Sequence, residues 1–327
     1  MLRYIGRRLG MMVITLFAIS IISFIVIQLP PGDFLTAMME RLEQSGYTRD
    51  QATIDSLTKR YGLDQPIYMQ YLTWMWGMLH GDFGQSFYFN RPVGELIWER
   101  LGLTMAVSLT ALIFTWVVAL PIGIYSAVKQ YSIGDYVFTF FGFVGIGIPS
   151  FMLAIILMWL AFSIFGANVG GLFSAAYNDA PWTWAKVVDL LKHIWLPMIV
   201  LGVAGTAGLI RVLRAQLLDE IRKPYVVTAR AKGLTETRLT LKYPLRVALN
   251  PFVSTIGWML PGLVGGEIIV SMVLGLPTTG PVLFRALMVQ DMYLAGTFIM
   301  MLSLLTVVGM LISDLLLAWV DPRIRLG

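Results

Sequence analysis

Between long apolar runs, one polar stretch of the chain reads Tyr225-Val226-Val227-Thr228-Ala229-Arg230-Ala231-Lys232-Gly233-Leu234. It belongs to a wider segment, 211–250, that carries nine Lys or Arg residues against three Asp or Glu residues. Membrane proteins keep compact basic loops on the cytoplasmic side. The small residues and the glycine of the stretch leave room for a second protein to approach closely. We therefore expect 211–250 to be a cytoplasmic loop on which a partner protein acts.

The composition supports a membrane location. Of the 327 residues, 57% are hydrophobic and only 13% are charged, whereas soluble domains carry about 25% charged residues. The mean hydropathy is +0.74. The net charge of +5 comes from basic residues in loops, so it indicates orientation in a membrane and not nucleic-acid binding. The absence of cysteine excludes disulfides and thiolate metal sites.

Six apolar stretches are each long enough to cross a bilayer as a helix: 9–29, 103–128, 137–162, 194–213, 252–275 and 293–319. The N-terminal arm has three arginines and no acid, and 30–102 has six basic and nine acidic residues. The sequence therefore predicts an all-α, multi-pass membrane protein with both termini cytoplasmic. We divide it into 1–29 (N-terminal arm and first helix), 30–102 (a small external helical segment) and 103–327 (a five-helix core containing the cytoplasmic loop 214–250).

Motifs for catalysis are missing from the sequence. There is no Gly-x-x-x-x-Gly-Lys-Ser/Thr loop for nucleotides, no His-Glu-x-x-His zinc motif and no Gly-x-Ser-x-Gly elbow. The two histidines, His80 and His193, lie in different loops without metal-spaced partners. We therefore expect no catalytic residue and no metal site, and the chain should not be an enzyme.

Only two carboxylates, Glu267 and Asp314, lie clearly inside the apolar stretches. A buried acid in a membrane faces water or a hydrogen-bonding partner, so Glu267 fits a solute path or a subunit contact as well as it fits a structural hydrogen bond. For Asp314 a structural partner is the better interpretation. Prolines and glycines that free backbone groups add to the candidate solute path, which comprises Pro149, Ser150, Gly265, Gly266 and Glu267.

The chain resembles the oligopeptide/dipeptide permease family of ABC importers, the binding-protein-dependent inner-membrane components, and within it the first permease subunit type. The resemblance covers essentially the whole chain and includes, in order, Arg7-Arg8-Leu9, Pro31-Gly32-Asp33, Gly62-Leu63-Asp64-Gln65-Pro66, Gly81-Asp82-Phe83-Gly84, Pro121-Ile122-Gly123, Ile148-Pro149-Ser150-Phe151, 225–234, Leu245-Arg246-Val247-Ala248-Leu249-Asn250-Pro251 and Asp321-Pro322-Arg323-Ile324-Arg325.

The resemblance implies a type I ABC importer permease fold with six transmembrane helices, in the inner membrane of a prokaryote. It implies a second homologous permease subunit, two cytoplasmic ATPase subunits that bind ATP and Mg, and an external solute-binding protein. No cofactor is expected in this chain. The segment 225–234 would be the helix that couples to an ATPase subunit, through Tyr225, Thr228, Ala229, Arg230, Ala231, Lys232, Gly233 and Leu234.

Some positions depart from the family pattern, namely Pro224, Val227, Val247 and Pro277-Thr278-Thr279-Gly280, and the 163–193 loop is short for a dipeptide permease. They leave transport by alternating access as the expected activity and leave the solute open between an oligopeptide and an oligosaccharide or other hydrophilic molecule of similar size. A stand-alone channel or secondary carrier is the alternative from another class. It predicts several acids or charged pairs at mid-membrane, and this sequence has few.

Overall fold

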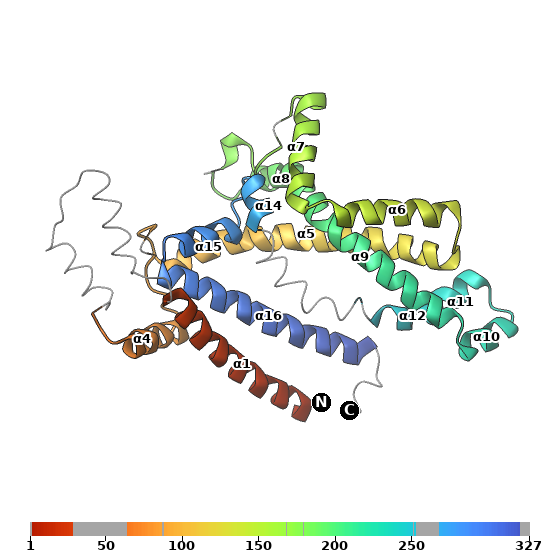
Figure 1. Cartoon of the computed structure of the whole chain (residues 1–327), viewed down its shortest axis with the longest axis horizontal. Helices are drawn as coiled ribbons and strands as arrows, with labels where there is room; N and C mark the ends of the chain where they lie inside the picture. The colour runs from red at the N-terminus through yellow and green to blue at the C-terminus, as the bar shows by residue number, and fades with distance from the viewer. Residues whose placement is uncertain are drawn as a thin grey trace. The chain divides into compact units, whose positions relative to one another are not determined.

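A computed structural model describes residues 2–28, 64–86, 88–167, 169–178, 180–250, 252 and 268–320. Within these ranges the regular elements are all helical, and one isolated bridge joins Gln85 to Pro92. The all-α prediction is confirmed for this part of the chain (Figure 1). The elements are α1 (Leu2–Gln28), α4 (Ile67–Leu79), α5 (Val93–Val128), α6 (Ile133–Gly147), α7 (Ser150–Phe165), η1 (Ala175–Tyr177), α8 (Trp184–His193), α9 (Trp195–Ile221), α10 (Pro224–Ala231), α11 (Glu236–Lys242), α12 (Pro244–Ala248), α14 (Ile268–Val273), α15 (Thr279–Met288) and α16 (Met292–Val320).

Four of the described helices, α1, α5, α9 and α16, are long and apolar enough to cross a membrane. The bent pair α6 and α7 makes a fifth candidate if the two count as one span. These elements occupy five of the six predicted stretches. The remaining stretch, 252–275, lies mostly outside the described residues, and α14 is its described end. The count of six spans therefore stays a prediction.

The predicted stretch 137–162 is not one continuous helix. α6 and α7 meet at an angle of 104°, and Ile148 between them is extended, with φ −90° and ψ 121°. Pro149 explains the break, because its ring disfavours helical geometry at the preceding residue and it has no amide to donate. Apolarity alone therefore predicted the length of this stretch but not its change of direction.

The chain divides into two compact units, 1–102 with 278–307 and 103–277 with 308–327. In the first unit, α4 packs on α1 through its aromatic side chains. The ring of Phe24 lies 5.4 Å from that of Tyr71 and 5.9 Å from that of Trp74, and the hydroxyls of Ser20 and Tyr71 share a hydrogen bond of 2.8 Å. These aromatic contacts and this hydrogen bond hold α4 against α1. The first part of the predicted external segment 30–102, residues 30–63, lies outside the described residues.

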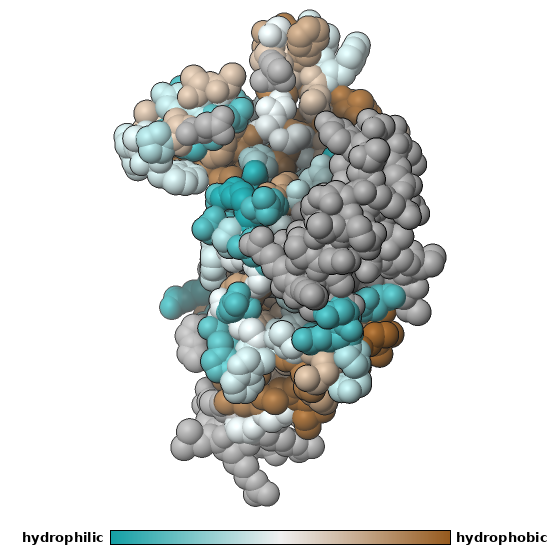
Figure 2. All heavy atoms as spheres, turned by 90° about the vertical axis from the view of Figure 1, so that its left-hand side faces the viewer, coloured by the Kyte–Doolittle hydropathy of each residue, from teal (hydrophilic) through white to brown (hydrophobic). Residues whose placement is uncertain are grey.

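In the second unit, α9 is the central helix and contacts α6, α7, α8 and α12. Its buried residues Leu213 and Leu217 pack with Ala119 of α5 and Ala248 of α12. Large apolar side chains stay exposed on the outer faces of α6 and α7, for example Phe140, Phe162 and Ile164. Hydrophobic residues also lie open on the molecular face drawn in Figure 2. Exposed apolar helix faces are expected where the solvent is lipid.

Candidate coupling site

A proline and a glycine set the limits of α10. α9 ends at Ile221, and Lys223 is extended, with φ −70° and ψ 146°, immediately before Pro224. Pro224 occupies the first turn of α10, where its missing amide costs no helical hydrogen bond. Beyond the last helical residue, Gly233 has φ +80°, a conformation that glycine adopts without strain. The sequence thus turns the chain sharply at both ends of an eight-residue helix.

One face of α10 is fixed against α11. Val226 is fully buried and Ala229 is 7% exposed, and both pack with the fully buried Leu239. Leu234 and Tyr243 cover this small cluster. Ala229 was predicted to leave room for a partner protein, but its methyl group faces the protein's own interior. Its small size lets α10 approach α11.

The opposite face of α10 is open to the surroundings. Of the eight predicted coupling residues, six are exposed, Leu234 is half-buried and Ala229 is buried; the exposed six are Tyr225, Thr228, Arg230, Ala231, Lys232 and Gly233. Val227 is also 53% exposed and was not among the predicted residues. No clear signal for it exists in the sequence, because the preceding residue, Val226, is also a valine and is buried.

Two acidic side chains, Glu236 and Glu220, accept hydrogen bonds from residues on this open face. The guanidinium of Arg230 donates to both carboxylate oxygens of Glu236, at 2.5 and 3.0 Å, and this contact lowers the pKa of Glu236. The Tyr225 hydroxyl donates to Glu220 at 2.6 Å. Burial and that carboxylate raise the pKa of Tyr225, so the phenol stays neutral. Among the described residues Lys232 has no ion-pair partner, which leaves it available for an acid on another protein.

α10 is connected to α9 by two routes. The direct route is the turn at Arg222 and Lys223, where the Lys223 amide donates to the Glu220 carbonyl at 3.1 Å. The second route runs through packed helices, since α10 contacts α11, α11 contacts α12, and α12 contacts α9. Figure 1 shows these short helices gathered at one end of α9. α10 is therefore joined to α9 both through the chain and through packed helices.

The structure describes only part of the candidate solute path. Pro149 and Ser150 lie at the bend between α6 and α7, with Pro149 exposed and Ser150 half-buried. Gly265, Gly266 and Glu267 lie outside the described residues. Asp314 is half-buried on α16, next to the buried Ser313. Which of these residues a solute meets therefore stays a prediction.

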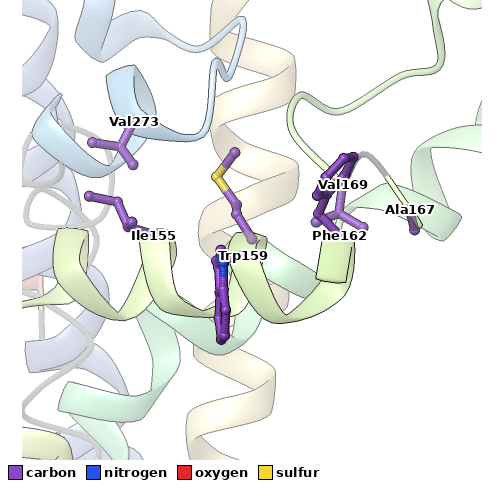
Figure 3. A pocket seen from close by; sticks show the side chains of 7 residues that line it. Ile155, Trp159, Phe162, Ala167, Val169 and Val273 are labelled. Carbon is purple, nitrogen blue, oxygen red and sulfur yellow. The ribbon is translucent and has the colours of Figure 1, made fainter. Parts of the chain in front are cut away.

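A cavity of about 450 Å³ lies beside α7, lined by Ile155, Met158, Trp159, Phe162, Ala167, Val169 and Val273. Figure 3 shows Ile155 near Val273 at one end and Phe162 near Val169 at the other. This lining offers no charged or hydroxyl side chain. It therefore lacks the groups that would orient a hydrophilic solute, and we assign it no role in binding one.

The described residues contain no cluster of His, Asp or Glu that could hold a metal ion. Both histidine rings instead contact carbonyls of their own helix. Nδ1 of His80 lies 2.8 Å from the Trp76 carbonyl, and Nδ1 of His193 lies 2.8 Å from the Asp189 carbonyl. These contacts give both histidines local structural roles.

Comparison with known proteins identifies relatives over the full length. Residues 119–326 match the family described as binding-protein-dependent transport system inner membrane component, and residues 1–110 match the N-terminal region of such membrane components. The chain is 36% identical over 326 residues to the oligopeptide transport system permease protein AppB of Bacillus subtilis, covering 99% of this chain and 100% of that protein.

Two further relatives are peptide permeases by name. The dipeptide transport system permease protein DppB of Escherichia coli is 31% identical over 343 residues, which cover 99% of each chain. The oligopeptide transport system permease protein OppB of Mycobacterium bovis is 30% identical over 331 residues, which cover 100% of each chain.

Proposed function

The chain belongs to the family of inner-membrane components of binding-protein-dependent transport systems, and from this membership we propose that it is one permease subunit of an ATP-driven importer. In this proposal it pairs with a second homologous permease and forms half of the translocation path. Two cytoplasmic ATPase subunits bind ATP and Mg, and an external binding protein delivers the solute. The path opens alternately to the two sides of the membrane.

The observation that carries this proposal is the construction of α10. One face is fixed by Val226 and Ala229 against Leu239. The other presents exposed polar residues, among them Lys232, which has no ion-pair partner in the part of the chain that the structure describes. A helix built in this way can be held by a partner and still pass displacement to α9 through two connections. We therefore place the ATPase contact at Tyr225, Thr228, Arg230, Ala231, Lys232 and Gly233, with Leu234 and Ala229 holding the helix in position.

The charge pattern of the loops supports the same orientation. The basic segment 211–250 and the arginine-rich N-terminal arm lie on one side in this topology, and that side is the cytoplasm by the preference of Lys and Arg for it. Both termini are then cytoplasmic, and 30–102 faces the binding protein. These assignments put α10 where a soluble ATPase can reach it.

The solute we propose is an oligopeptide. The relatives at 36%, 31% and 30% identity are named oligopeptide or dipeptide permeases. The departures at Pro224, Val227 and Val247 all lie in the loop 214–250, which is cytoplasmic in the proposed topology. Ligands retained by the purified binding protein decide between a peptide and an oligosaccharide.

A bulky side chain on the open face of α10 tests the coupling assignment. Ala231→Trp is suited to this test because Ala231 is exposed and a larger side chain there displaces nothing inside the chain. In the reconstituted importer we expect the variant to lose ATP-dependent uptake and to co-purify less ATPase subunit. Ala176→Trp is the matched control, an exposed alanine of η1 on the opposite side of the membrane in the proposed topology.

Unchanged uptake and unchanged ATPase co-purification in Ala231→Trp would remove α10 from the contact. Uptake by the purified chain alone, without ATP or companion subunits, would instead establish the stand-alone carrier. Loss of ATPase binding in Ala176→Trp but not in Ala231→Trp would indicate the opposite topology, with η1 on the cytoplasmic side.

A further inference from the structure

α6 and α9 pack side by side in one antiparallel register (Figure 1). Three close pairs define it. Asp135 of α6 meets Arg214 of α9, a Cβ added to Gly142 would lie 3.8 Å from Cβ of Ala207, and one added to Gly145 would lie 2.9 Å from Val203 Cγ1. From the first pair to the second, the contact moves seven residues forward along α6, from 135 to 142. It moves seven residues back along α9, from 214 to 207, as expected for antiparallel helices.

The Asp135–Arg214 pair fixes one end of this register. The Arg214 Nε donates to one carboxylate oxygen at 3.0 Å, and its Nη2 donates to the other at 2.8 Å. Asp135 is only 2% exposed, and its carboxylate also accepts from the Tyr131 amide at 2.9 Å. Two parallel hydrogen bonds to a planar guanidinium set orientation as well as distance. This pair therefore opposes both sliding and rotation of α6 on α9.

The glycines fix the rest of the register by shape. At Gly145 a methyl group would press on the Val203 side chain, so the α6 backbone lies directly against α9 there. Small residues at helix interfaces in membranes allow this close approach. Interlocked surfaces of this kind have discrete arrangements and do not deform continuously.

The two helices connect the coupling helix to the bend. α9 receives displacement from α10, and α6 ends at Gly147, next to the bend at Ile148 and Pro149. α6 has 15 residues, so it extends roughly 22 Å from the Asp135 end. We propose that α6 and α9 move as one rigid body during transport, held in register by Asp135 and Arg214. The movement of this body changes the bend between α6 and α7 at Pro149. The proposal rests on the proposed function of α10.

A disulfide across the helix pair tests rigid-body motion. The chain has no cysteine of its own, and the 3.8 Å separation at Gly142 and Ala207 matches the Cβ separation of natural disulfides, about 3.8 Å. The double variant Gly142→Cys/Ala207→Cys, oxidised in the complete importer, should retain ATP-dependent uptake, because the bond joins surfaces that never separate. Loss of uptake on oxidation, with recovery on reduction, would show that α6 and α9 separate and would overturn the proposal.

The ion pair is tested by its effect on coupling. Asp135→Asn keeps the shape of the side chain and removes its charge, and we expect uptake per ATP hydrolysed to fall about fivefold while the complex still assembles. The oxidised disulfide should restore the ratio in Asp135→Asn, since holding the register is the role assigned to the pair. An unchanged ratio in Asp135→Asn, or a reduced ratio that the disulfide does not restore, would refute a positioning role.

The matched control is Glu99→Gln. Glu99 also accepts two hydrogen bonds from one arginine, Arg91, at 2.6 and 3.3 Å, but this pair is exposed. Its loss should leave uptake per ATP unchanged.

The importer without substitutions distinguishes failure of the proposed function from failure of the rigid-body inference. If it shows no ATP-dependent uptake, the proposed function fails; if it does and the oxidised double variant does not, only the rigid-body inference fails. Should Asp135→Asn not assemble, the disulfide experiment alone decides the inference.

Discussion

The hydroxyl of Ser86 donates a hydrogen bond of 2.6 Å to the carboxylate of Asp291, 205 positions further along the chain. Asp291 is completely buried. Its carboxylate also accepts from the amide of Tyr88 at 3.1 Å and from the amide of Leu294, in the first turn of α16, at 3.2 Å. A single side chain therefore joins the turn before α5 to the beginning of α16 and caps that helix.

Replacing Asp291 by alanine should be costly, because several buried donors would lose their acceptor together. We expect Asp291→Ala to lower the free energy of unfolding by about 3 kcal/mol, measured by denaturant unfolding of the detergent-solubilised chain. Asp82→Ala is the control in the same turn. Asp82 accepts from Gly84 at 3.0 Å in an exposed setting, and its loss should cost about 1 kcal/mol or less. Equal losses in the two variants would contradict the role given to Asp291.

Two glycines on the same helix should respond differently to a methyl group. A Cβ at Gly202 would overlap the ring of Phe114 and lie 3.3 Å from Thr115 Oγ1, whereas one at Gly208 meets nothing within 4 Å. We expect Gly202→Ala to lower the free energy of unfolding by about 1–3 kcal/mol through overpacking. Gly208→Ala should be neutral or stabilise by up to about 1 kcal/mol, because alanine is the better helix former. Equal effects in the same denaturant titration would show that α5 and α9 are not packed as described.

Much of the helical arrangement could be predicted from the sequence, because long apolar stretches in a membrane protein have few alternatives to helix. α1, α5, α9 and α16 occupy predicted stretches. α5 and α9 nevertheless extend beyond the stretches that predicted them, since a helix continues into polar sequence where packing or capping supports it. The acidic residues Asp219 and Glu220, for example, lie in the last turn of α9, beyond the predicted end at 213.

The segment 225–234 shows which structural features the sequence could not predict. Composition and residue order singled out 225–234 as a candidate segment, but the small size of a residue could not predict on which side of the helix it lies. Ala229 turned out to be buried and Ala231 exposed, because Leu239, ten positions after Ala229, supplies the surface that Ala229 packs on. The partner of Asp135 was equally hidden, since Arg214 lies 79 positions away and only the fold brings the two together.

Lys186 holds the segment between α7 and α8 without an acidic partner on its ammonium group in the described structure. Its Nζ donates to the carbonyls of Ala180 at 2.6 Å and Asn178 at 3.3 Å, and it lies 4.8 Å from the ring centroid of Phe173. Lys186→Met keeps an apolar stem but leaves those carbonyls unpaired. It should lower the free energy of unfolding by about 2 kcal/mol and speed proteolysis within 170–183.

Lys192→Met is the control for that experiment. Lys192 is exposed in the last turn of α8, so its replacement should change the free energy of unfolding by about 0.5 kcal/mol or less. If the two lysine variants lose stability equally, the carbonyl and aromatic contacts of Lys186 contribute nothing specific.

Asp189 makes the stability of the same region depend on pH. Burial opposes its charged form, but hydrogen bonds from the Ser174 amide at 2.8 Å and the Ser174 hydroxyl at 3.0 Å, together with His193 and Lys192, outweigh burial and lower the pKa of Asp189. An acid whose pKa is lower in the folded state than in the unfolded chain stabilises the fold above its unfolded pKa, about 3.9. That contribution is lost as the pH falls through the folded value.

We therefore expect Asp189→Asn to be less stable than the parent chain by about 2 kcal/mol at neutral pH, and the difference to shrink steadily below a pH of about 4. Denaturant unfolding of both proteins across this range measures the gap at each pH. Asp64→Asn, at an exposed position, is the control at neutral pH and should show only a small gap. A gap for Asp189→Asn that stays constant or widens toward acid would mean that the Ser174 hydrogen bonds do not favour the charged carboxylate, because favouring it requires stability to be lost on protonation.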